Sequence, residues 1–261
     1  LLWHPSSPIR KAALEVVTVL LRRGIMNPLT CSKRLIGLQA DSNVTIKRNS
    51  LCLLVNEHSK RPEVIACGIY DAVAGCFEVY AKTRKADSLQ KSIPGGLLND
   101  VYSNFIVVDN KLQRRFLRQM GHLFDDTKPY VPLVHDSALF SSSLEGAVTD
   151  DVLLRKKVLR VRFLEFLAIQ LSKLPFRLVE EPLMLIHTLS RLASIRGASI
   201  MEELRRSHVA SNNENARPER SAEKDAKFDN PFSSSVRVHC LEALAVIIGM
   251  RLRTFLQSRY G

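Results

Sequence analysis

The chain has 261 residues, a hydrophobic fraction of 46% and a formal net charge of +12. The length and hydrophobic fraction allow a substantial core, arranged as one or two ordinary domains or as part of a longer solenoid. The positive charge suits a polyanionic partner such as nucleic acid or an acidic protein surface. The sequence disfavours a membrane protein, because no apolar run reaches the ~18–20 residues without charges that a helical span requires.

Residues with reactive side chains are present, but they do not form a catalytic pattern. The five cysteines are odd in number and contain no C-x-x-C pair, which favours buried small side chains in a reducing compartment over disulfides or zinc. Gly95-Gly96 is not followed by the G-K-[ST] of a phosphate loop. Glu180-Glu181 is more typical of a helix start than of an acid–base pair. We therefore expect no enzyme, no cofactor and no metal.

Helices are predicted throughout the first third of the chain, each bounded by a cap, a proline or a glycine. Gly24, for example, ends the first helix after an apolar–polar pattern of helical period. The predicted helices span residues 8–23, 28–41, 43–60 and 63–84.

The first and third of these helices resemble each other. Ile9-Arg10, Ala13-Leu14 and Val17 match Ile46-Lys47, Ser50-Leu51 and Leu54 at a constant offset of 37 residues. A period of this length is similar to that of HEAT repeats, in which helix pairs stack because no pair buries its apolar face alone.

The rest of the chain also has a helical pattern, interrupted by polar stretches. Pro175 ends one long helix, and Gly197 is predicted to end the next, which starts at Glu180-Glu181-Pro182. Residues 127–151 are predicted to be a loop-rich insertion, and residues 210–232 a disordered linker with few apolar side chains. The predicted helices here span residues 97–108, 111–124, 152–174, 182–197, 198–206 and 236–260.

These elements predict an all-α protein, a fragment of a HEAT-repeat-type α-solenoid (an α-α superhelix). We expect terminal HEAT repeats over residues 1–110, a C-terminal helical domain over 111–209, the linker 210–232 and a C-terminal helix over 233–261. Because the chain starts without Met and enters a helical pattern at once, we interpret it as the C-terminal part of a longer protein.

Basic side chains are the main functional signal. Residues 1–61 carry ten Lys or Arg and only three Asp or Glu, often as adjacent basic pairs. Such pairs at the edge of a solenoid could follow a phosphate backbone, while a solvated outer face remains the alternative. The candidate DNA-binding residues are Lys33, Arg34, Lys47 and Arg48, and the second choice is Arg155, Lys156, Lys157, Arg160 and Arg162.

Three stretches resemble the C-terminal end of the Nipped-B family, the large HEAT-repeat subunit of the cohesin loader. They are residues 8–41, residues 113–127 (Q-R-R-F-L followed by L-F-D-D-T) and residues 175–207. The motif positions, which we expect to be structural, are Arg114, Arg115, Asp125, Asp126, Pro175, Glu180, Glu181, Pro182, His187 and Gly197. For His187, we favour a buried histidine with satisfied hydrogen bonds over a ligand.

The resemblance implies a non-enzymatic subunit that binds DNA and the ATPase heads and kleisin of cohesin, promotes cohesin loading onto chromatin and stimulates the cohesin ATPase, supporting sister chromatid cohesion. It also implies a nuclear location, with the small loader subunit bound upstream of this stretch. The alternative is a protein-only helical scaffold or adaptor whose positive charge matches an acidic client.

Overall fold

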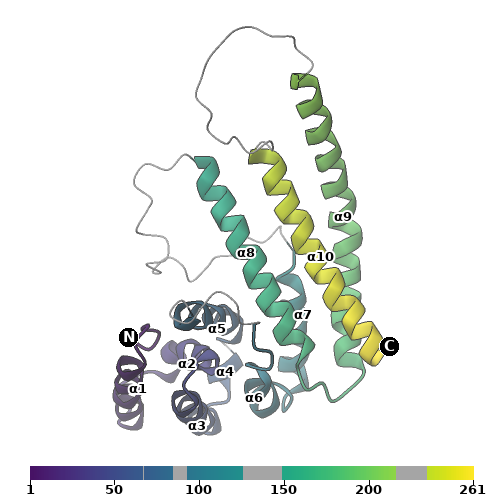
Figure 1. Cartoon of the computed structure of the whole chain (residues 1–261). Helices are drawn as coiled ribbons and strands as arrows, with labels where there is room; N and C mark the ends of the chain where they lie inside the picture. The colour runs from purple at the N-terminus through teal and green to yellow at the C-terminus, as the bar shows by residue number, and fades with distance from the viewer. Residues whose placement is uncertain (67, 85–92, 126–148, 216–233) are drawn as a thin grey trace, which may run out of the picture.

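The computed structural model describes residues 1–66, 68–84, 93–125, 149–215 and 234–261. All regular structure in these ranges is helical, as predicted (Figure 1). The helices are α1 (Ser7–Arg22), α2 (Pro28–Gly37), the 3-10 helix η1 (Leu38–Ala40), α3 (Val44–Lys60), α4 (Glu63–Ala66), α5 (Ile69–Arg84), α6 (Asn99–Val101), the π-helix η2 (Tyr102–Ile106), α7 (Asn110–His122), α8 (Thr149–Ser172), α9 (Glu180–Asn215) and α10 (Ser234–Tyr260).

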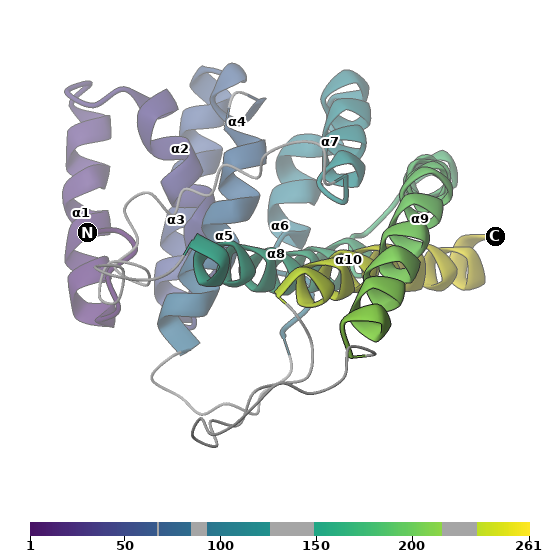
Figure 2. The same cartoon turned by 90° about the horizontal axis from the view of Figure 1, so that it is seen from above.

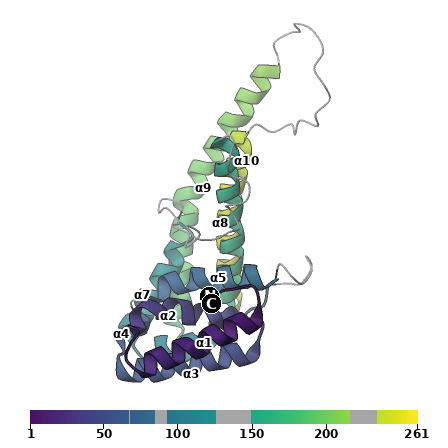
Figure 3. The same ribbon diagram turned by 90° about the vertical axis from the view of Figure 1, so that its left-hand side faces the viewer.

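The helices α1 to α7 form a HEAT-like stack, and α8, α9 and α10 form a long bundle. In Figure 2 the helices α1 to α7 succeed one another across the molecule, while α8 and α10 run across the direction of these helices, from α5 towards α9. Figure 3 shows the bundle of α8, α9 and α10 rising from this stack. One cluster of buried apolar side chains extends from Leu2 before α1 to Leu256 in α10, so a single core joins the two parts.

Trp3 fixes the N-terminal end of the stack. Its indole lies between α2 and α5, where a Cβ added to Gly37 or Gly75 would come within 2.9 Å or 2.8 Å of the ring. The indole Nε1–H donates a hydrogen bond to the carbonyl oxygen of Arg34 at 3.0 Å. The two glycines therefore provide the space for a large aromatic side chain between neighbouring helices.

The buried stripe of α1 includes a charged residue, Arg10, which an apolar pattern does not predict. It consists of Arg10, Leu14, Val17 and Leu21, while Ile9 is exposed. In α3 the buried positions include Ile46, Ser50, Leu53 and Glu57, so the two stripes correspond at an offset of 36 residues, and the predicted offset of 37 was wrong. A buried arginine in place of an apolar residue is the reason for the error.

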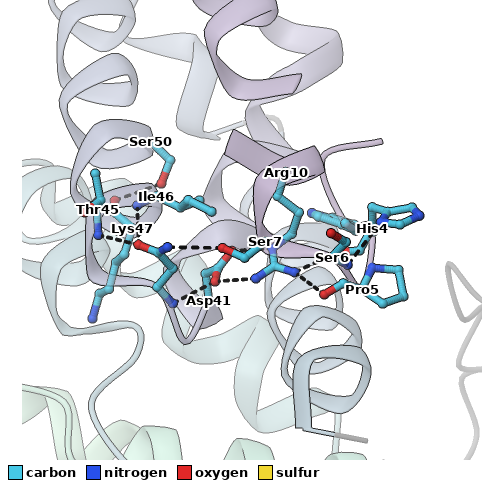
Figure 4. A network of polar contacts seen from close by, with 12 residues as sticks. His4, Pro5, Ser6, Ser7, Arg10, Asp41, Thr45, Ile46, Lys47 and Ser50 are labelled. Carbon is cyan, nitrogen blue, oxygen red and sulfur yellow. Dashed lines mark hydrogen bonds and ion pairs between the residues drawn. The ribbon is translucent and has the colours of Figure 1, made fainter. Parts of the chain in front are cut away.

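Arg10 is part of a buried polar network that joins the start of α1 to the turn before α3 (Figure 4). Its guanidinium donates two hydrogen bonds to the Asp41 carboxylate, at 2.7 and 2.8 Å, and further ones to the carbonyl oxygens of His4 and Pro5. The Asp41 carboxylate also accepts the backbone N–H of Asn43, whose side chain caps α3. Arg10 is therefore a structural residue and not part of a basic surface.

Several predicted boundaries need correction. The long helix predicted over residues 63–84 is divided into α4 and α5, and Gly68 lies in the turn between them. The predicted helix end at Gly197 was wrong, because α9 continues through it and Gly197 does not have a positive φ. Gly24, by contrast, has φ +69 and follows α1 as predicted.

The predicted insertion and linker fall mostly outside the described residues. Of the insertion, residues 149–151 belong to α8, and of the linker, residues 210–215 belong to α9, so these short parts are helical and not loop or disordered. The division of the chain into a HEAT part, a helical domain, a linker and a last helix stays a prediction.

Candidate functional site

The first-choice basic residues lie on two helices that contact each other. Lys33 and Arg34 are on α2, and Lys47 and Arg48 are on α3. Arg34 and Arg48 are exposed, while the two lysines are half-buried. The Lys47 ammonium lies 3.8 Å from the Asp100 carboxylate of α6, which reduces its contribution to the surface charge. The adjacency of the two helices agrees with the prediction, and the role in DNA binding is still a proposal.

The second-choice residues are divided between solvent and the interior of the bundle. Arg155, Lys156 and Arg162 are exposed on α8. The Lys157 ammonium forms an ion pair with Glu242 of α10 at 2.6 Å, and Arg160 is 9% exposed with its guanidinium 3.5 Å from the Leu123 carbonyl oxygen. Lys157 and Arg160 therefore hold α8 against its neighbours and are poor candidates for a phosphate contact.

Glu181 is the most constrained residue of the family-like motif. It is buried at the start of α9, where its carboxylate accepts hydrogen bonds from the backbone N–H groups of Arg177 and Leu178 and from the Tyr102 hydroxyl, the last at 2.7 Å. Burial, and next the hydrogen bond to Glu181, raise the pKa of Tyr102 above its usual value, so the phenol remains a donor. This arrangement gives Glu181 a structural role at a helix start.

The other motif residues are distributed between the start of α9, the end of α8 and α7. Pro182 is buried in the first turn of α9 but occupies its third position and not the predicted first one. Pro175 follows the end of α8 at Ser172, as predicted, and the exposed Arg114 lies 3.9 Å from the exposed Glu180. Arg115 is exposed and Asp125 half-buried, whereas Asp126 lies outside the described residues.

Gln170 is a structural residue that the sequence did not reveal. Its fully buried side-chain amide accepts the backbone N–H of Leu97 at 2.9 Å and donates to the carbonyl oxygen of Pro94 at 2.7 Å. A single side chain of α8 thus pairs with two backbone groups of the segment before α6, called the Pro94 loop below. A polar residue at an inward position of α8 was the only sequence signal, and it does not identify a partner 76 residues away.

His187 lies on the surface, so the prediction of a buried histidine was wrong. It lines a hollow of about 250 Å³ between α7 and α9, together with Arg118, His122 and Arg191. Arg118 and His122 belong to α7, and only the fold brings them next to α9. The sequence alone did not indicate that these four nitrogen-bearing side chains lie together.

One group of side chains has the composition of a metal site. Ligand atoms of Glu203, His239 and Glu242 lie within 4.8 Å of one another. The Lys157 ammonium is already 2.6 Å from Glu242, and its positive charge opposes a second cation there. The group is better described as an ion-pair cluster that joins α8, α9 and α10.

The groups with shifted pKa values in the described part of the chain are structural. Burial raises the pKa of Cys31, and it raises that of Cys76 to about 12. Both thiols, like Tyr102, are therefore held neutral and are not poised for proton transfer or nucleophilic attack. No helix in the described ranges has the length and apolar character that crossing a bilayer requires.

An all-α stack of neighbouring helices with basic exposed side chains has the architecture of a helical-repeat protein. The family model described as sister chromatid cohesion C-terminus, Nipped-B_C, matches residues 1–192. The chain belongs to this family. The match ends inside α9, so the end of that helix and all of α10 lie beyond it.

Curated relatives have the same family name. The chain is 24% identical over 216 residues to Nipped-B-like protein A of Danio rerio, covering 79% of this chain and 8% of that protein. It is 25% identical over 215 residues to Nipped-B-like protein of Homo sapiens, covering 79% of this chain and 6% of that protein. The chain thus spans less than a tenth of the length of these relatives. No solved structure gives a significant match.

Proposed function

We propose that the chain is the C-terminal, non-enzymatic part of a cohesin-loading subunit that acts in the nucleus. Membership in the family of sister chromatid cohesion C-termini supports this role. On this proposal the HEAT-like stack holds DNA near the ATPase heads and kleisin of cohesin, promotes loading and stimulates ATP hydrolysis by cohesin. The small loader subunit would bind upstream of this stretch.

The observation that carries the DNA part of the proposal is the presence of exposed basic residues on the adjacent helices α2 and α3, in a chain of net charge +12. Arginine and lysine that contact phosphates release condensed counterions, which provides affinity without sequence specificity. Arg34 and Arg48 are the stronger candidates, because Lys47 lies beside Asp100.

The test is a duplex-DNA titration at several salt concentrations with Lys33, Arg34, Lys47 and Arg48 all replaced by Ala. We expect weaker binding to every sequence and a salt slope that is smaller by about 0.9 for each phosphate that the variant no longer neutralises. In the matched control, four arginines at other exposed positions are replaced by Ala, so that the same charge is removed: Arg22, Arg23, Arg205 and Arg206. Equally weakened binding in both variants would show that net charge alone acts, and the proposed edge would be wrong.

The alternative function is a protein-only scaffold that binds an acidic client. It predicts cohesin or client binding without measurable DNA affinity, even at low salt, where DNA contacts are strongest. Measuring the cohesin ATPase rate with this chain, with and without duplex DNA, separates the two functions. Stimulation that requires DNA supports the loader, and binding to cohesin subunits with no DNA dependence supports the scaffold.

A further inference from the structure

The helices α7 and α9 approach each other closely at Gly121. A Cβ added to this glycine would come within 2.8 Å of the Thr188 side chain, so a larger residue would displace Thr188 or move the two helices apart. On α7, Arg118 lies one turn before Gly121 and His122 directly after it, and both line the same hollow as side chains of α9. The hollow of about 250 Å³ lies at this crossing and is called the α7–α9 hollow below.

Four nitrogen-bearing side chains line the α7–α9 hollow from both walls. Arg118 and His122 are four residues apart on α7, and His187 and Arg191 are four residues apart on α9, so each pair shares one helix face. The lining contains no carboxylate; Thr188, Met184 and Leu192 complete it.

These four side chains are also unoccupied by other partners. Within the described ranges none of them forms a side-chain hydrogen bond or an ion pair, although other basic residues of α7, α8 and α9, namely Arg114, Lys157 and Arg206, do form ion pairs. The Thr188 hydroxyl is already used, since it donates to the Met184 carbonyl oxygen at 2.9 Å. Two guanidinium groups and two imidazoles therefore surround a concave site with free donors and at least two positive charges.

We propose that the α7–α9 hollow binds the phosphate group of a phosphorylated serine or threonine side chain on a partner protein. A phosphate monoester carries a charge of about −1.5 to −2 at neutral pH and three strong acceptor oxygens. Arginine recognises such a group with two parallel hydrogen bonds, and each imidazole supplies an N–H donor in its neutral or protonated form. Recognition of phosphorylated motifs by arginine clusters follows the same chemistry.

The shape of the site favours a phosphorylated side chain over the backbone of duplex DNA. The basic side chains line one hollow from two helices. Duplex DNA instead requires basic groups distributed along a line of phosphates. The apolar Met184 and Leu192 in the wall suit the carbon atoms of a peptide. Along α7, Lys111 and Arg115 are exposed on the approach to Arg118, so acidic residues beside the phosphorylated one should strengthen binding.

The hollow is separate from the proposed DNA edge. It lies between α7 and α9, while α2 and α3 belong to the other end of the stack (Figure 2). The two sites can therefore be tested independently, and the failure of one proposal would leave the other intact.

The experiment measures fluorescence anisotropy of a peptide pool with a fixed phosphothreonine and degenerate flanking positions, beside the same pool with threonine. We expect saturable binding of the phosphorylated pool only. Replacing Arg118 and Arg191 by Ala should raise its Kd about tenfold to a hundredfold. R22A/R23A is the matched control, since it removes the same charge from exposed positions at the end of α1 and should leave the Kd unchanged.

Two further measurements separate the site from a general charge effect. R118K/R191K keeps the charge but removes the paired hydrogen bonds, and it should bind the phosphorylated pool more weakly than the unsubstituted chain. Titration of the unsubstituted chain with O-phospho-L-threonine should shift the imidazole NMR signals of His122 and His187 more than those of the other histidines, and this readout needs no variant.

Several results would overturn the proposal. They are equal binding of the two peptide pools, equally weakened binding in R118A/R191A and R22A/R23A, full binding by R118K/R191K, or unchanged His122 and His187 signals. If R118A/R191A had a lower duplex-DNA affinity and kept its phosphopeptide affinity, the hollow would be a DNA contact instead.

Discussion

At the scale of single residues, the stability of the stack should depend on the buried Arg10–Asp41 ion pair. Arg10 is 1% exposed and Asp41 6%. Removal of one side chain therefore leaves the other charge buried, with neither its ion-pair partner nor water to stabilise it. Replacing Asp41 by Ala should lower the free energy of unfolding by about 3–5 kcal/mol, measured by urea denaturation. K11M, at an exposed neighbouring position, should change it by less than about 0.5 kcal/mol.

The double variant R10M/D41A distinguishes the effect of a buried charge from that of poorer packing. Removing both charges relieves the desolvation cost, so this variant should be more stable than D41A. Exposed ion pairs contribute about 1 kcal/mol or less to stability. If D41A lowered the free energy of unfolding by no more than this amount, the Arg10–Asp41 pair would not be buried in solution.

Cysteine chemistry gives a second prediction for single residues. Burial raises the pKa of Cys76 to about 12, and its thiol donates a hydrogen bond to the Ile36 carbonyl oxygen. In the native chain at pH 8, a thiol reagent should modify the exposed Cys52 and Cys240 rapidly, and Cys31 and Cys76 only at the rate of unfolding. Mass spectrometry of samples taken at successive times measures the order in which these cysteines are modified.

The same shift makes the contribution of Cys76 depend on pH. Its usual pKa is about 9 and its folded pKa about 12, so above pH 9 the unfolded chain releases a proton that the folded chain retains. The stability difference between the unsubstituted chain and C76A should therefore be constant below pH 9 and decline from pH 9 towards 12. A difference that does not change over this range would show that Cys76 is not buried in solution.

At the scale of elements, the continuity of α9 through Gly197 gives a test. A Cβ at Gly197 would have no heavy atom within 4 Å, and the residue does not have a positive φ. G197A should therefore stabilise the chain by about 0.5–1 kcal/mol, because glycine is unfavourable inside a helix. G24A, at a position with φ +69, should destabilise it instead. If G197A were less stable than the unsubstituted chain, the result would support the predicted helix end at Gly197.

The same helix shows what local sequence could predict. The acidic start of α9, Pro175 after α8 and Gly24 after α1 have physical causes within a few residues, and they were predicted. Gly197 has the residue type of a helix end but no following stop signal, and the packing of α9 against α10 overrides it. The burial of Arg10 likewise depends on Asp41, 31 residues away, which no periodicity in α1 reveals.

The candidate site was harder to predict, for the same reason. Charge density identified basic helices, but it could not show that Lys157 and Arg160 of α8 point into the bundle or that Lys47 lies near Asp100. The α7–α9 hollow depends on the approach of two helices at Gly121. Each of its residues was visible in the sequence, and only tertiary packing brings them together.

At the scale of the whole molecule, one core connects the HEAT-like stack to the bundle. The chain contains a single tryptophan, Trp3, which lies at the opposite end of this core from Leu256. Tryptophan fluorescence therefore reports on the N-terminal end of the stack, while far-ultraviolet circular dichroism reports on all helices.

Urea unfolding followed by both signals should give the same midpoint, because a shared core makes the stack and the bundle one cooperative unit. The contacts that cross between them include Gln170 with the Pro94 loop and Glu181 with Tyr102. Q170A removes the first of these and should lower both midpoints together, since buried backbone groups are then left without partners. If the midpoints from fluorescence and circular dichroism differed by more than the fitting error, the stack and the bundle would unfold as two separate units.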